Sequence, residues 1–253
     1  MITTITNQKG GIGKTTTALS LGYGLAARGY KTLLVDMDAQ ANLTMAAGIK
    51  SELNIYDLMK RKNRAADTIR PITDKLDIIA GSNNMATLDL DINEVGKEYR
   101  LKEVLEPIQA AYDFIIIDTP PALNLTTINA LTVADSVIIP GQADIFSLDA
   151  VKRLYNETIS VIKRYTNPHL IIDGILITRY KGRNLLTREM LEAYNDLAQE
   201  LHTRVYNVKI RDTVTLSESQ TFSADIFSYS KNSNAAADYS AFVDEYLEGK
   251  TKQ

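Results

Sequence analysis

The chain has 253 residues, of which 45% are hydrophobic and 23% charged, enough to bury one large core or two small ones. It contains no cysteine, which excludes a disulfide framework, a thiolate metal site and an iron–sulfur cluster. No run of about 18 apolar residues occurs, and the first residues lack a signal-peptide pattern, so we expect a soluble, cytoplasmic protein that makes no membrane contact.

The net charge of −3 argues against a nucleic-acid binder if it is taken alone, but the charge is unevenly distributed. Residues 151–211 carry 11 Lys/Arg and 6 Asp/Glu, so the rest of the chain is acidic. A binding surface and an ordinary solvated helical face explain this regional excess equally well.

Short, nearly all-apolar runs rich in β-branched residues predict strands at residues 2–6, 32–35, 76–79, 114–117, 136–139 and 171–177. Helical spacing of apolar residues, as in 15–28 and 187–201, lies between them. This alternation predicts a doubly wound α/β fold, with a mostly parallel sheet covered by helices on both faces, in a single domain spanning residues 1–253. Ligands of such sheets bind at the carboxyl ends of strands, so functional motifs should directly follow strands.

The first motif, residues 7–16, is Asn-Gln-Lys-Gly-Gly-Ile-Gly-Lys-Thr-Thr, between the first strand and an Ala/Leu-rich helix. Glycines allow a tight turn whose N–H groups point inward, and the helix N-terminus adds positive potential, so the loop suits a polyphosphate. We expect Lys14 to reach the β- and γ-phosphates and Thr15 to coordinate Mg²⁺. The remaining predicted nucleotide-binding residues are Lys9, Gly10, Gly11, Ile12, Gly13 and Thr16.

This loop resembles the deviant Walker A box of the ParA and Soj-type partition ATPases, a P-loop family that also contains MinD. The resemblance implies binding of ATP or ADP with Mg²⁺ and an ATP-dependent homodimer. It also implies that Lys9 reaches the phosphates of the partner subunit and, with Lys14, serves catalysis. A second cation beside the γ-phosphate would stabilise the transition state as an arginine finger does.

Two acidic motifs follow predicted strands. Residues 36–42, Asp-Met-Asp-Ala-Gln-Ala-Asn, resemble the first switch of the family, with Ala39 in place of proline. By that match Asp38 activates or positions the attacking water as a catalytic residue, and Asp36 supports the metal; a helix N-cap pair is the alternative. Asp118, followed by Thr-Pro-Pro, resembles the second switch and is predicted to meet Mg²⁺.

The segment 175–187 resembles the part of the family that contacts nonspecific double-stranded DNA, with Arg183 matching the family arginine. Lys181, Arg188 and Arg211 are the further DNA-binding candidates, and a solvated loop is the alternative. Near residue 211 the chain departs from the family, whose Ile-Pro-Arg-Asn-Val-Arg reads Ile-Arg-Asp-Thr-Val-Thr at 210–215. The resemblance implies partition of DNA, a ParB-like centromere-binding partner that stimulates hydrolysis, and association with the nucleoid.

Other proteins with this type of loop do different work. A MinD-like positioning ATPase would need a basic amphipathic C-terminal helix, whereas residues 242–248 are acidic. Iron proteins need cysteines, and the tyrosine kinases of this fold carry a C-terminal tyrosine cluster, whereas Tyr229, Tyr239 and Tyr246 are dispersed. An ATP-dependent ligase acting on a small molecule is the main alternative, although no second catalytic set is evident.

Overall fold

The computed structural model describes residues 1–182 and 185–250. Its strands form one seven-stranded sheet in the order β3-β4-β2-β5-β1-β6-β7, parallel except for the antiparallel pair β3 and β4. The strands are β1 (Ile2–Ile5), β2 (Thr32–Asp36), β3 (Ile69–Thr73), β4 (Leu76–Ile79), β5 (Phe114–Asp118), β6 (Ser136–Gly141) and β7 (Ile171–Ile177). The predicted mostly parallel α/β sheet is confirmed.

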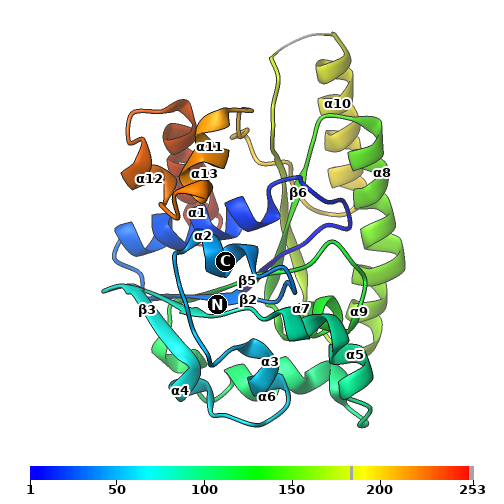
Figure 1. Cartoon of the computed structure of the whole chain (residues 1–253). Helices are drawn as coiled ribbons and strands as arrows, with labels where there is room; N and C mark the ends of the chain where they lie inside the picture. Colours follow the sequence, from blue (N-terminus) through cyan, green and yellow to red (C-terminus); the bar gives the residue numbers. More distant parts are fainter. Residues whose placement is uncertain (183–184, 251–253) are drawn as a thin grey trace.

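Helices cover both faces of this sheet (Figure 1). One group comprises α1 (Lys14–Ala27), α2 (Asn42–Ala46), α11 (Val214–Thr221), α12 (Ile226–Tyr229) and α13 (Asn234–Lys250). The other comprises α3 (Ile55–Met59), α6 (Arg100–Leu105), α7 (Leu125–Val133), α8 (Ile145–Arg153), α9 (Ser160–Tyr165) and α10 (Leu185–Glu200). Two short helices, α4 (Ala65–Thr68) and α5 (Leu88–Asp91), lie near α3 and α7, and a π-helical turn at Leu154–Ile159 joins α8 to α9.

The strand side chains alternate between two cores, as a strand buried on both faces requires. On β5, Ile115 and Ile117 belong to the core under α7 and α8, whereas Phe114 and Ile116 belong to the core under α1 and α13. All four are buried. This double burial explains why the strands read as continuous apolar runs in the sequence.

Strand β3 was not predicted, and its sequence explains the omission. Its five residues, Ile-Arg-Pro-Ile-Thr, are half-buried or exposed, and Pro71 lies at a register shift against β4. Proline cannot donate a ladder hydrogen bond and is tolerated on edge strands and at bulges, which is where β3 places it. A short polar edge strand gives no apolar pattern to detect.

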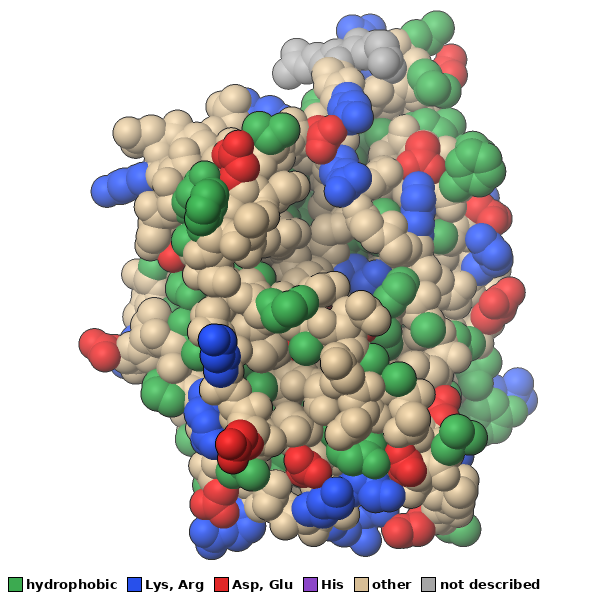
Figure 2. Space-filling model, in the orientation of Figure 1, with side chains coloured by type: hydrophobic (Ala, Val, Ile, Leu, Met, Phe, Trp, Pro, Cys, Tyr) green, Lys and Arg blue, Asp and Glu red, His purple; other side chains and the backbone are tan. Residues whose placement is uncertain are grey.

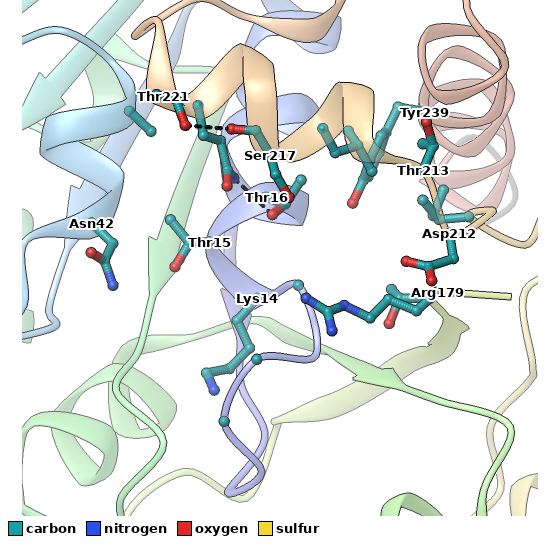
Figure 3. A pocket seen from close by; sticks show the side chains of 18 of the residues that line it. Lys14, Thr15, Thr16, Asn42, Arg179, Asp212, Thr213, Ser217, Thr221 and Tyr239 are labelled. Carbon is teal, nitrogen blue, oxygen red and sulfur yellow. Dashed lines mark hydrogen bonds between the residues drawn. The ribbon is translucent and has the colours of Figure 1, made fainter.

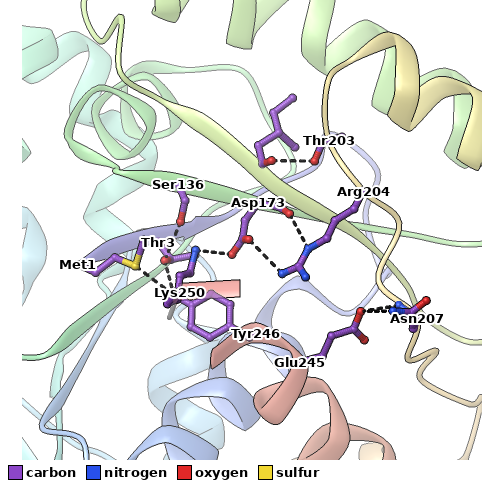
Figure 4. A network of polar contacts seen from close by, with 11 residues as sticks. Met1, Thr3, Ser136, Asp173, Thr203, Arg204, Asn207, Glu245, Tyr246 and Lys250 are labelled. Carbon is purple, nitrogen blue, oxygen red and sulfur yellow. Dashed lines mark hydrogen bonds and ion pairs between the residues drawn. The ribbon is translucent and has the colours of Figure 1, made fainter. Parts of the chain in front are cut away.

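A polar network fastens the far end of α13 to the sheet (Figure 4). Asp173 on β7 is buried and accepts hydrogen bonds from Lys250 Nζ at 2.6 Å and Arg204 Nη2 at 3.3 Å. Nearby, the Tyr246 hydroxyl lies 2.7 Å from Thr3 Oγ1 on β1. These contacts join the last helix to strands at the centre and edge of the sheet.

Candidate nucleotide-binding site

The glycine loop between β1 and α1 has the backbone shape that the sequence predicts. Gly11 and Gly13 have φ of 70° and 85°, in the left-handed region that only glycine enters without strain. The loop is tied down from both sides, because Asn7 Nδ2 donates to the Pro140 carbonyl at 2.8 Å and Thr178 Oγ1 donates to the Ile12 carbonyl at 2.7 Å. The loop is therefore held rigidly at the carboxyl end of the sheet, with α1 starting at Lys14.

A pocket of about 640 Å³ opens above this loop, a size typical of small-molecule sites. Figure 2 shows a hollow in the middle of the face of the molecule turned toward the reader, with Lys and Arg side chains at the edges of the hollow. Its lining includes six of the eight predicted nucleotide-binding residues: Gly10, Gly11, Gly13, Lys14, Thr15 and Thr16. Ile12 is fully buried beneath the loop, and Lys9 points elsewhere.

Lys14 is the buried cation among the described residues that line this pocket. Its side chain is buried and its Nζ donates to the Lys9 carbonyl at 3.1 Å. Burial lowers the pKa of Lys14, while the Asp118 and Asp38 carboxylates act in the opposite direction. A lysine with so little solvent around it gains strongly from an anion entering the pocket.

The register of the sheet brings the predicted acids together. Asp36 ends β2 and Asp118 ends β5, and the two are directly paired across these strands. Asp38 lies two residues beyond β2, is buried, and lines the pocket, where its Oδ1 accepts a hydrogen bond from the Gln40 N–H at 3.0 Å. The predicted meeting of these three acids with the glycine loop is thus present in the fold.

Asp36 and Asp118 differ in how their oxygens are used. Asp36 accepts hydrogen bonds from Thr44 N–H at 2.9 Å, from Thr44 Oγ1 at 2.7 Å and from the Asp38 N–H at 3.2 Å. Asp118 Oδ2 accepts one from Thr15 Oγ1 at 2.7 Å, but its Oδ1 is buried without a partner among the described residues. Asp36 therefore braces the first acidic segment, whereas Asp118 keeps an oxygen available for a ligand.

The free Asp118 oxygen and the Thr15 hydroxyl fit a Mg²⁺ ion. Magnesium takes hard oxygen ligands and usually keeps several waters, so one carboxylate and one hydroxyl supply enough protein ligands beside phosphates. An orphaned buried oxygen is costly unless something satisfies it. Burial, and next the Asp36 carboxylate, raise the pKa of Asp118 to about 8, and burial raises that of Asp36 to about 6. A divalent cation bound here would offset the repulsion between the Asp36 and Asp118 carboxylates.

The end of the pocket opposite the glycine loop is formed by residues that the sequence did not identify as ligands (Figure 3). Ile210 to Thr213, α11 and Tyr239 of α13 line it, and Gln220 Nε2 donates to Thr16 Oγ1 at 2.8 Å. These segments lie some two hundred residues from the loop in sequence, and residues 210–215 depart from the family pattern. Nothing local marks them as a pocket wall.

Lys9 is held within its own subunit. Its Nζ donates to Asp144 Oδ2 at 2.9 Å, to Asp144 Oδ1 at 3.1 Å and to Ser147 Oγ at 2.9 Å, at the start of α8. About a third of each side chain in the ion pair is exposed, so the contact is a weak one that an external anion can replace.

The DNA-binding candidates do not form one free cluster. Lys181 forms an ion pair with Asp212 at 3.1 Å, and Arg211 forms one with Asp238. Lys181 and Arg211 line a shallow groove beside the nucleotide pocket. Arg188 is exposed on α10. Arg183, the leading candidate, lies outside the described residues.

Comparison with known proteins gives a consistent picture. Residues 1–172 match a family described as an AAA domain. The chain is 37% identical to the sporulation initiation inhibitor protein Soj of Bacillus subtilis, covering 94% of each chain. It is 34% identical to the chromosome partitioning protein ParA of Myxococcus xanthus, covering 98% of this chain and 88% of that one.

A solved structure, cobyrinic acid a,c-diamide synthase from Mycobacterium smegmatis with bound ADP and magnesium, superimposes with a TM-score of 0.84. It is 28% identical, and the match covers 99% of this chain and 95% of that one.

Proposed function

The chain belongs to the ParA/Soj-type family of P-loop ATPases, and from this premise we propose that it hydrolyses ATP to partition DNA. It is an ATPase that binds ATP, and the product ADP, together with Mg²⁺. The proposal rests chiefly on one observation: the Thr15–Asp118 pair faces Lys14 at the head of a rigid glycine loop. We propose that residues 1–253 form a single domain that carries out ATP hydrolysis and DNA partition.

In the proposed mechanism, loop N–H groups and Lys14 bind the β- and γ-phosphates. Thr15 and Asp118 hold the metal, and Asp36 keeps the first acidic segment in place behind them. A bound Mg²⁺ at Thr15 and Asp118 would supply positive charge that offsets the negative charge of the phosphates. Asp38 orients the attacking water at the pocket wall.

Lys9 is proposed to act across a homodimer. It leaves Asp144 and Ser147 and reaches the phosphates of the partner subunit when two ATP-bound loops approach. Gly10 has nothing within 4 Å of where a Cβ would stand, so the subunit itself has room for a side chain there. Gly10→Val should therefore bind ATP normally and fail to dimerise, which light scattering with ATP and with ADP would measure.

We propose nonspecific duplex DNA as the surface to which the dimer binds, with Arg183, Lys181, Arg188 and Arg211 as contacts. A ParB-like protein that stimulates hydrolysis is the proposed partner, and the nucleoid the proposed location. The basic balance of residues 151–211 supports this assignment, because backbone binding needs only clustered lysine and arginine.

A membrane-positioning role has less support. The described residues contain no helix long and apolar enough to span a bilayer. Phe242, Val243 and Tyr246 of α13 are buried in the core against α1, so this helix does not offer them to a lipid surface.

The second candidate function is that of an ATP-dependent ligase, because the fold is similar to that of the diamide synthase. DNA binding separates the two. Interferometry on an arbitrary duplex, at about 50 and 200 mM salt, should show binding with ATP but not with ADP, and a salt slope of about 0.9 per phosphate contacted. Arg183→Glu should lose this binding and still dimerise with ATP. If the wild type ignores DNA at low salt with ATP, the partition proposal fails and the ligase becomes the better candidate.

A further inference from the structure

Arg179 stands in the nucleotide pocket without an assigned role. It follows β7 and lines the pocket together with the glycine loop. Its neighbour Thr178 fixes it there, because Thr178 N–H donates to the Gly141 carbonyl at 2.7 Å while its hydroxyl donates to the Ile12 carbonyl of the loop. Figure 3 shows the Arg179 side chain extended across the pocket, with its guanidinium toward the glycine loop.

The backbone at Arg179 is strained. Its φ is 48°, in the left-handed region that residues other than glycine rarely adopt. Both neighbours of Arg179 in the chain are held in place. On one side Thr178 is bonded to Gly141 and Ile12, and on the other Tyr180 N–H donates to the Ile210 carbonyl at 2.9 Å while the Tyr180 carbonyl accepts from the Asp212 N–H at 3.2 Å. Strain that the surroundings enforce is found preferentially at ligand sites, where it aims a side chain.

Arg179 is also a cation for which the described residues provide no partner. The other basic side chains around it have acidic partners: Arg211 has Asp238, Lys181 has Asp212, and Lys9 has Asp144. Among the described residues, no hydrogen bond or ion pair engages the Arg179 guanidinium, and its side chain is exposed to the pocket. Three of the described basic residues line the pocket, and within the described part of the chain Arg179 and Lys14 have no acidic partner within 4 Å, whereas Arg211 has one.

We propose that Arg179 binds the polyphosphate chain of the nucleotide held in its own subunit, as a second cation beside Lys14. This inference rests on the proposed function of the pocket, and it adds Arg179 to the residues that contact the nucleotide. The planar guanidinium offers two parallel N–H groups to phosphate oxygens, whereas the lysine ammonium acts as a point charge. Arg179 thus complements Lys14 from the opposite wall, and it does so within the subunit, unlike Lys9.

The test compares three variants by calorimetric titration with Mg-ADP and with Mg-tripolyphosphate, which lacks base and sugar. Arg179→Met removes the charge and keeps the length, and Arg179→Lys keeps the charge without the fork. Arg179→Gly suits the left-handed backbone and so removes the side chain without adding backbone strain. Lys209→Met removes a nearby positive charge that does not line the pocket and serves as the control.

We expect Arg179→Met and Arg179→Gly to lower the affinity for both ligands about tenfold, and Arg179→Lys to lower it less. Lys209→Met should leave the affinity for both ligands nearly unchanged. Thermal melting without ligand should show Arg179→Gly folded as stably as the wild type.

Loss of Mg-ADP binding with unchanged tripolyphosphate binding would place Arg179 on the base or sugar and overturn the inference. Equal binding by all the variants would overturn the inference about Arg179 but not the proposed function, since the pocket would still bind nucleotide. A wild type that binds neither ligand would overturn the proposed function as well.

Discussion

The roles proposed for single residues in the nucleotide pocket divide into holding the ligand and acting on it. Lys14 is buried beside the loop and is proposed to contact the phosphates, whereas Asp38 lines the same pocket, accepts a hydrogen bond from the Gln40 N–H and is proposed to act on water. Both were identified from the sequence because each directly follows a predicted strand or loop. Their meeting in space follows from the parallel sheet, which collects strand ends at one edge.

This division predicts different failures for the two residues. Lys14→Ala should abolish nucleotide binding, because the buried cation is removed from the ground-state complex. Asp38→Ala should bind ATP as tightly as the wild type and lose hydrolysis, because the role proposed for Asp38 is confined to the attacking water. Calorimetric titration and a phosphate-release assay measure the two effects. Normal turnover by Asp38→Ala would remove its catalytic role.

The raised pKa of Asp118 predicts a pH dependence of stability in the absence of nucleotide and magnesium. Burial and the Asp36 carboxylate raise this pKa to about 8, well above the value of an unfolded aspartate. Between these two values the folded state holds a proton that the unfolded state has released, so stability falls as the pH rises toward 8.

We expect the free energy of unfolding in urea to fall by up to about 2 kcal/mol between pH 6 and 8.5 through this group. Asp118→Asn, which carries no charge at either pH, should show a much smaller decline. The same decline in both proteins would show that Asp118 is ionised in the folded state throughout this range.

At the scale of elements, the sequence predicted all the central strands and edge strand β7, and it missed the other edge strand, β3. The apolar runs 32–35 and 114–117 extend in the structure by one residue, to Asp36 and Asp118. Both carboxylates are buried, and an apolar pattern does not include them. Edge strand β3 and the pocket wall at Ile210–Thr213 escaped prediction. Both are defined by tertiary neighbours, such as the isolated bridge between Tyr180 and Arg211, and not by a local pattern.

The packing of α13 on α1 depends on a close approach at Gly24. A Cβ added there would lie 2.5 Å from Val243 Cγ2, which is closer than two carbons can approach. Gly24→Ala should therefore lower stability by about 1–2 kcal/mol despite the better helix propensity of alanine. Val243→Ala makes room, so the double variant should lose less than the sum of the two single variants. Strict additivity in chemical denaturation would contradict a tight contact.

At the scale of the whole molecule, the Asp173 network decides how firmly the last helix is attached. Asp173→Asn leaves Lys250 and Arg204 without their carboxylate in a largely buried setting, and should cost about 2–3 kcal/mol of unfolding free energy. Asp149→Asn breaks an exposed pair with Arg153 and should cost less than about 0.5 kcal/mol. Equal melting temperatures for these two variants would show that the buried network adds no stability.

The order of strands in the sheet also sets an order of events during synthesis. Strand β1 emerges first from the ribosome but lies between β5 and β6, so it waits for more than one hundred further residues before either neighbour exists. Contacts this distant in sequence make folding slow and leave apolar strands unpaired for a time, when they are prone to aggregate. The wall at Ile210–Thr213 and helix α11 arrive later still. A nascent chain therefore displays its glycine loop long before it has a complete pocket, and nucleotide can stabilise only the nearly finished protein.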